Sequence, residues 1–227
     1  MTALLPAPVL PAPPQIDQAA LLVLVQWLSP AFPTGAYAYS HGLEAAIAAG
    51  DVTTPAALAD WVADVLAHGA GRTDAILLAH ALRPGADHDG LTALARALCA
   101  TAERLQETTE LGAAFTLATN ALTGADHAPA PLPVAIGRAA ASLGLPPELV
   151  LAQSLQSFAG TLILAAVRFM PMGQTEGQRM LAALHPLILR LAKTAAETPL
   201  SAIGSTAIRG DIASARHETL DVRIFRT

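Results

Sequence analysis

Apolar residues recur three and four positions apart along most of this chain, which is the spacing of an amphipathic helix. The clearest case follows Thr54-Pro55, an N-cap residue followed by a proline at the first helical position. The apolar residues of that stretch are Leu58, Trp61, Val62, Val65 and Leu66. No run of alternating β-branched residues bounded by turns occurs, so the pattern predicts helices and no sheet.

The same spacing and the positions of glycine and proline predict where the other helices lie. They are expected between Asp17 and Pro30, over 40–49, from Pro55, and over 73–83, 90–100, 103–122, 134–143, 147–169 and 174–197. The fold class is therefore all-α, a single globular domain over 17–227 with about eight to ten helices packed around a central apolar one. Residues 1–16 hold many prolines and are predicted to form a short, flexible, proline-rich arm.

The composition raises the question of a membrane, because 53% of the residues are apolar and 14% are charged. The best candidate span, 149–170, is interrupted by Gln153, Gln156 and Arg168. A spanning helix needs about 20 predominantly apolar residues. We therefore interpret this segment as a buried helix and expect no membrane partner. Surplus apolar surface in such a chain is typical of contact with another protein.

Charge and cysteine content exclude other classes. The net charge is −5 and no cluster of lysine and arginine stands out, so nucleic-acid binding is not expected. The single cysteine, Cys99, cannot form an internal disulfide. The N-terminus shows no basic region followed by an apolar one, so no secretory signal is predicted and we expect a cytoplasmic protein.

Motifs of enzymes are missing from the sequence. It has no G-x-x-x-x-G-K-[ST] loop, no G-x-S-x-G elbow and no H-E-x-x-H, so no catalytic residue, cofactor or metal ligand is assigned. The histidines are interpreted as surface or capping residues, and Glu103, Glu107 and Glu110 as a solvated helix face. Two alternatives stay open: a helical metal-dependent enzyme with scattered His and Glu ligands, and a ligand-binding helical regulator. The histidines are His41, His68, His80, His88, His127, His185 and His217.

Two segments have the composition of protein interfaces. The first, 29–44, holds both tyrosines, Tyr37 and Tyr39, whose rings either contact a partner or cover the chain's own core. The second, 211–227, ends in apolar residues among arginines, including Arg223 and Phe225. This tail is too short to bury its own apolar groups. It must dock either on its own domain or on another chain.

These segments resemble the UreF family of urease accessory proteins, in order and in spacing. The matching residues are Ser29-Pro30, Phe32-Pro33-x-Gly35-x-Tyr37-x-x-Ser40-x-Gly42-Leu43-Glu44, Pro171-x-Gly173-Gln174 with Gln178, and Arg216-His217-Glu218 with Arg223-Ile224-Phe225-Arg226.

The resemblance implies an all-helical, non-catalytic assembly protein that forms a homodimer. It implies that the protein binds the accessory protein UreD and recruits the GTPase UreG, which brings nickel to apo-urease. It also implies that Tyr37 and Arg223 support the surface that recruits the GTPase. Tyr39 and Phe225 are predicted to be partner-binding residues beside them.

Overall fold

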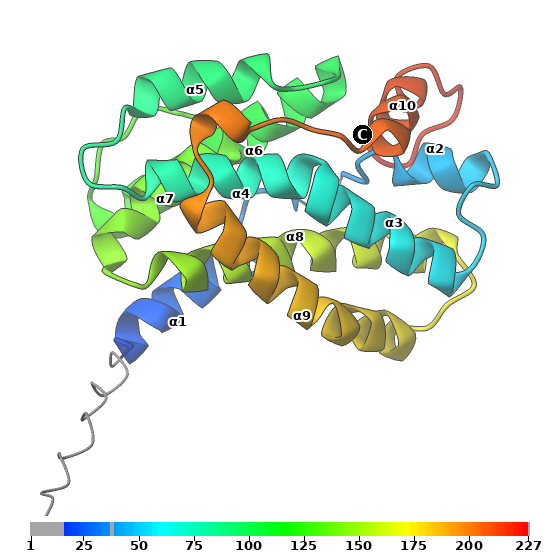
Figure 1. Cartoon of the computed structure of the whole chain (residues 1–227), viewed down its shortest axis with the longest axis horizontal. Coiled ribbons are helices and arrows are strands. Elements are labelled where there is room, and N and C mark those ends of the chain that lie inside the picture. Colours follow the sequence, from blue (N-terminus) through cyan, green and yellow to red (C-terminus); the bar gives the residue numbers. More distant parts are fainter. Residues whose placement is uncertain (1–15, 37–38, 227) are drawn as a thin grey trace, which may run out of the picture.

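Helices form the secondary structure of this chain in the computed structural model, which describes residues 16–36 and 39–226 and has no strand among them (Figure 1). The all-α prediction is confirmed. The predicted arm, 1–16, lies outside the described residues except for Ile16. The helices are α1 (Gln18–Trp27), α2 (Leu43–Ala48), α3 (Pro55–His68), α4 (Ala70–Ala81), α5 (His88–Ala97), α6 (Ala102–Thr123), α7 (Leu132–Ala140), α8 (Pro147–Phe169), α9 (Gln174–Glu197) and α10 (Ile208–His217), with short 3-10 helices at Ala141–Leu143 and Leu200–Ala202.

Side-chain caps begin several of these helices at the residues that the sequence indicates. The Asp17 carboxylate accepts hydrogen bonds from the first turn of α1, and the Thr54 hydroxyl accepts one from Ala57 N at 3.1 Å. Thr101 caps α6 in the same way. Each cap satisfies a backbone N–H that has no partner inside the helix.

The apolar helix α8 lies in the middle of the molecule and packs against α9, α4, α3 and α2 (Figure 1). Gly177 of α9 permits the close approach of that helix, because a Cβ there would lie 3.1 Å from Ile163 and 3.2 Å from Val167. Among the described helices, α8 is the one long and apolar enough to cross a membrane. The buried part of this apolar stretch, 44% of it, packs against other helices, as the sequence predicted for a buried helix.

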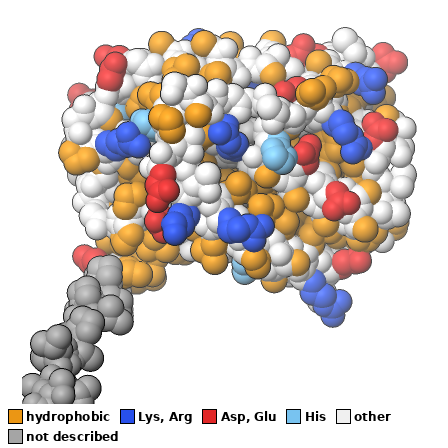
Figure 2. Space-filling view, in the orientation of Figure 1, with side chains coloured by type: hydrophobic (Ala, Val, Ile, Leu, Met, Phe, Trp, Pro, Cys, Tyr) orange, Lys and Arg blue, Asp and Glu red, His pale blue; other side chains and the backbone are white. Residues whose placement is uncertain are grey.

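Helix α7 packs on both α4 and α6, α4 also contacts α8, and α5 contacts α4 and α7. The chain then returns from α9 to place α10 against α2 and α3, so that the C-terminal segment lies beside a segment near the start of the fold (Figure 1). On the face seen in Figure 2, acidic and basic side chains are interspersed with apolar ones.

Two boundaries differ from the prediction. Helix α2 begins at Leu43 rather than Ser40, because His41 and Gly42 have positive φ angles of 52° and 73°, which a right-handed helix does not contain. Helix α10 begins at Ile208, just before the segment 211–227 predicted as a tail, and extends into it as far as His217. Its buried side is made of Gly210, Ala213 and His217, which carry no strong apolar signal.

Candidate functional site

The C-terminal tail, defined here as residues 218–226, is held on the domain by a buried acidic side chain of α2. The two carboxylate oxygens of Glu44 accept hydrogen bonds from the backbone N–H groups of Ile224 and Phe225, both at 2.9 Å. Glu44 is itself buried. Hydrogen bonds to an ionised acceptor are stronger than neutral ones, so Glu44 fixes the path of the tail backbone.

His217, the last residue of α10, connects this carboxylate to α6. Its ring is 0% exposed. Nε2 lies 3.1 Å from Glu44 Oε2, and Nδ1 lies 2.7 Å from Glu103 Oε2. The other oxygen of Glu103 accepts a hydrogen bond from Arg223 at 2.6 Å. Glu44, His217 and Glu103 are termed the clasp below, since they join α2, α10, α6 and the tail.

A second acidic side chain, in the tail itself, binds the start of α6. The Glu218 carboxylate accepts hydrogen bonds from the backbone N–H groups of Ala102 and Glu103 at 2.8 and 3.2 Å. Helix N-termini favour negative charge through their free N–H groups and their dipole. Glu218 therefore stabilises the position of the tail on α6.

The aromatic ring of Phe225 anchors the far end of the tail. It is 4% exposed, and its centroid lies 5.1 Å from that of Phe169 at the end of α8. The guanidinium of Arg168 lies 6.0 Å from the same ring. Burial of a phenylalanine side chain contributes about 2 kcal/mol, so Phe225 is the main apolar contact of the tail.

Tyr39 and Arg226 meet on one carboxylate of α6. Arg226 lies 2.9 Å from Glu110 Oε2, and the Tyr39 hydroxyl donates to the same oxygen at 2.9 Å. Burial raises the pKa of Tyr39. Hydrogen bonds from Gln106 and then Tyr39 hold the pKa of Glu110 below its ordinary value. The tyrosine segment and the tail, far apart in sequence, therefore share one contact.

The structure divides the predicted partner-binding residues into two kinds. Tyr39 and Phe225 are buried against their own chain, whereas Arg223 is at the surface. Tyr37 lies outside the described residues. The two alternatives for the tail both apply in part: Phe225 docks on its own domain, while Val222 and Ile224 stay 79% and 72% exposed.

Two interpretations of charged residues were wrong in part. Glu110 is exposed, as expected for a solvated face of α6, but Glu107 is only 3% exposed and the tail covers Glu103. His217 and His41 are buried and contact carboxylates, rather than being surface or capping residues. Periodicity could not show this, because the side chains that cover these positions come from distant parts of the chain. The only sequence signals for Glu44 and His217 were the motifs that contain them.

Behind the clasp lies a second group of buried charges, termed the inner network. Glu107 Oε1 lies 2.8 Å from His41 Nε2, and Arg104 forms an ion pair with Asp74. Glu107 Oε2 lies 3.2 Å from Arg104 but without the alignment of a hydrogen bond. Burial raises the pKa of Asp74 despite the attraction of Arg104. Burial also opposes ionisation of Glu107, yet His41 and Arg104 together hold its pKa below the ordinary value.

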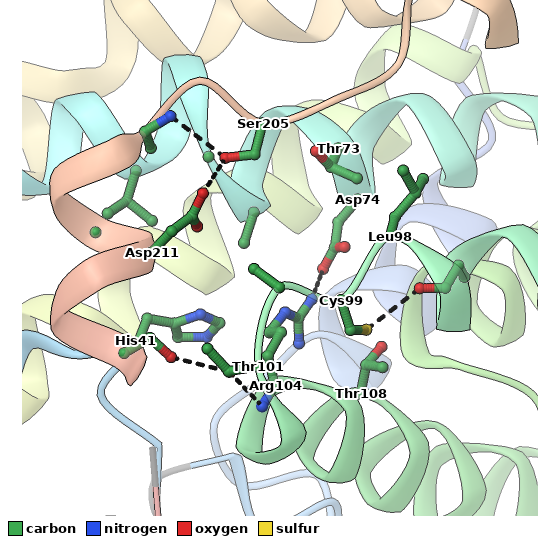
Figure 3. Close-up of a pocket in the computed structure, with 18 residues that line it drawn as sticks. His41, Thr73, Asp74, Leu98, Cys99, Thr101, Arg104, Thr108, Ser205 and Asp211 are labelled. Carbon is green, nitrogen blue, oxygen red and sulfur yellow. Dashed lines mark hydrogen bonds and ion pairs between the residues drawn. The ribbon is translucent and has the colours of Figure 1, made fainter. Parts of the chain in front are cut away.

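The inner network forms a wall between two small cavities, of about 60 and about 100 Å³. Figure 3 shows the smaller one, in which Asp74 and Arg104 point toward each other and Ser205 and Asp211 approach from the α10 side. Cys99 lines it as well, and burial raises the pKa of this thiol. A raised pKa leaves less thiolate, which is the reactive form, so Cys99 is not poised as a nucleophile in this cavity.

Metal ligands are not gathered at either place. In residues 16–36 and 39–226, no group of three or more His, Cys, Asp or Glu side chains is arranged to hold a metal ion. The ring nitrogens of His217 are both directed at carboxylates. The arrangement is one that fixes a surface segment in place.

Comparison with known proteins matches this chain to a family and to named relatives. Residues 52–185 match the UreF family. "Urease accessory protein UreF" of Cereibacter sphaeroides strain KD131 is 66% identical over 209 residues, covering 92% of this chain and 99% of the relative.

More distant relatives with the same name agree. The protein of Paracoccus denitrificans strain Pd 1222 is 50% identical, covering 92% of this chain and 97% of its own length. That of Dinoroseobacter shibae strain DSM 16493 is 49% identical, covering 92% of this chain and 99% of its own. On these matches, this chain belongs to the UreF family of urease accessory proteins.

Proposed function

We propose that this chain is a non-catalytic assembly protein of urease maturation, which binds the accessory protein UreD and recruits the GTPase UreG to apo-urease for nickel insertion. Membership of the UreF family supports an accessory role. The observation that carries the proposal is the docked tail. A chain terminus normally frays, yet this one is fixed by Glu44, Glu103 and Glu110 with its aliphatic side chains turned outward.

The outward side of the docked tail has the chemistry of a partner surface. Val222 and Ile224 are exposed, and Arg223 and Arg226 lie next to them in sequence. Aliphatic side chains beside arginine are common where proteins bind one another. Tyr39 and Phe225 are then buried residues that hold this surface in a fixed conformation. Tyr37 and Arg223 are the residues proposed to contact the GTPase.

The assembly proposal also includes a homodimer within the complex and a cytoplasmic location. In this role the chain holds the GTPase against the enzyme, so that nucleotide hydrolysis is coupled to metal release. The nickel is cargo of the complex and needs no resident metal site in this chain.

The alternative is a helical metal-dependent enzyme whose His and Glu ligands come from distant positions. In the described part of the chain the buried histidines His41 and His217 are bonded to carboxylates, and no set of three metal-ligating side chains forms. This arrangement favours the assembly role. Metal analysis of the purified chain distinguishes the two, because the enzyme requires a tightly held stoichiometric metal.

Reconstitution from purified components tests the proposal. We expect this chain with UreD to retain UreG on a column, and each protein alone to retain none. Tyr37→Ala should weaken retention by about 2 kcal/mol, as for an anchor tyrosine at an interface, while its melting curve stays unchanged. Leu189→Ala, at an exposed position of α9 that takes no part in the described site, is the matched control and should retain UreG as the unaltered chain does. Failure of the unaltered proteins to form a complex would contradict the proposed role.

A further inference from the structure

His217 is the most enclosed ionisable side chain near the tail, and the proposed function leaves it without a role. It is fully buried at the end of α10. Each of its two ring nitrogens lies within hydrogen-bond distance of a carboxylate oxygen, at 2.7 Å from Glu103 and 3.1 Å from Glu44. These carboxylates come from different helices, α6 and α2.

The number of protons in the clasp follows from these contacts. Each N···O hydrogen bond contains one proton, so the two bonds contain two. A neutral imidazole carries a single N–H, and ionised carboxylates carry none. The intact clasp therefore holds one proton more than a neutral histidine with two ionised glutamates, whether that proton resides on the ring or on an oxygen.

Other charged groups around the clasp keep that proton favourable. Glu44 faces the ring from α2 and Glu103 from α6, and Arg223 of the tail binds the outer oxygen of Glu103. With the extra proton the clasp has one net negative charge, which Arg223 balances. Without it, two carboxylates would face each other across a neutral ring in a buried site, where unbalanced charge is costly.

We propose that His217 positions the tail through this proton: docking of α10 and the tail takes up one proton into the clasp, and raising the pH releases the tail. The effect of this step on partner binding rests on the proposed function, since release of the tail would remove the surface proposed to bind the partner. An exposed histidine titrates at about pH 6.5 and is neutral above it. Docking above that pH therefore binds a proton and weakens by up to about tenfold for each unit of pH.

Substitution of Glu103 by glutamine separates docking of the tail from its dependence on pH. The new amide side chain would keep an oxygen for Arg223 and would offer an N–H to Nδ1 of His217, while Nε2–H still donates to Glu44. All bonds of the clasp are then made with a neutral imidazole. Glu103→Gln should leave the tail docked but remove the dependence on pH. In His217→Gln both N–H groups of the amide belong to one nitrogen and cannot reach carboxylates that contact different nitrogens of the imidazole, so docking should be weak at every pH.

The measurement is hydrogen exchange of the Ile224 and Phe225 amides in the full-length chain between about pH 6.5 and 8.5, expressed as protection relative to the intrinsic rate at each pH. These amides donate to Glu44 only when the tail is docked. We expect protection to fall at least about tenfold across this range in the unaltered chain. Glu103→Gln should give a flat profile. The exposed residues Glu176 and His185 provide the matched controls Glu176→Gln and His185→Gln, which should follow the unaltered chain.

Protection that does not change with pH in the unaltered chain, or that keeps its slope in Glu103→Gln, would overturn the proposal. Retention of UreG, measured on the same samples, separates this inference from the proposed function. If protection falls with pH but retention of UreG does not change when the tail is released, the result supports the clasp and contradicts the proposed partner surface. A flat protection profile, with retention still lost on tail deletion, contradicts the clasp and leaves the partner surface standing.

Discussion

Single buried carboxylates connect the segments that form the clasp and the inner network. Glu44 accepts three hydrogen bonds from the tail and α10, and Glu107 lies between His41 and Arg104. A buried charge that loses its partner is strongly destabilising, whereas an intact pair is close to neutral. Removal of either carboxylate is therefore expected to destabilise the fold, because the groups around it lose their buried partner.

The contacts of Glu107 predict how the free energy of unfolding changes at low pH. Burial opposes its ionisation, yet His41 and Arg104 hold its pKa below the ordinary value. A depressed pKa stabilises the folded state above the pKa of the unfolded chain, and this contribution is lost as the pH falls through the folded value. Glu107→Gln should lower the free energy of unfolding by about 3 kcal/mol at pH 7. The difference from the unaltered chain should shrink below about pH 4.

Urea unfolding from pH 7 to pH 3 measures this difference. Glu176→Gln, at an exposed position on α9, shows the effect of removing a carboxylate without a buried partner. A difference between Glu107→Gln and the unaltered chain that stays constant down to pH 3 would show that Glu107 is not ionised in the folded protein.

Among the helices, α10 depends most on close backbone contact. It packs on α2 at Gly42, where φ is +73° and a Cβ would lie 2.5 Å from Ser214 N. Gly42→Ala should therefore displace α10 and expose the clasp. Gly50 has a similar φ of +79° but open space around it, so Gly50→Ala carries only the left-handed penalty of about 1 kcal/mol.

Protease digestion of both glycine variants tests this contact. We expect trypsin to cleave Gly42→Ala within the tail, which contains Arg223 and Arg226, at a rate well above that of Gly50→Ala. Equal cleavage of the two variants would mean that α10 tolerates a side chain at position 42.

Local signals predicted most helices and missed one. Thr54-Pro55 marked the start of α3 because a cap and a proline act within a single turn. Helix α10 gave no such signal, since it has no side-chain cap and its buried face includes a glycine and a histidine. Its stability comes from packing on α2 and α3, which periodicity does not report.

At the scale of the whole molecule, the candidate site combines segments from both ends of the fold. The sequence indicated the tyrosine segment and the tail separately, and family motifs pointed to both. It could not show that Tyr39 and Arg226 meet on Glu110, or that Glu44 holds the tail backbone, because these contacts join residues far apart along the chain. Glu103 and Glu107 of α6 were misinterpreted as solvated for the same reason.

The central claim is that the docked tail is the surface on which the accessory complex assembles. Its most direct test is deletion of 220–227, which keeps His217 and Glu218, followed by retention of UreG in the presence of UreD and a melting curve on the same sample. Loss of the Phe225 contact alone should cost about 2 kcal/mol, which lowers the melting temperature by about 4 to 8 °C in a chain of this size. Loss of the tail hydrogen bonds to Glu44 and Glu103 adds to this decrease. The double variant Val222→Ser with Ile224→Ser keeps Phe225 and the clasp, so it should melt normally and bind weakly. The account predicts a folded, truncated chain that no longer assembles; a truncated chain that still forms the full complex would contradict it.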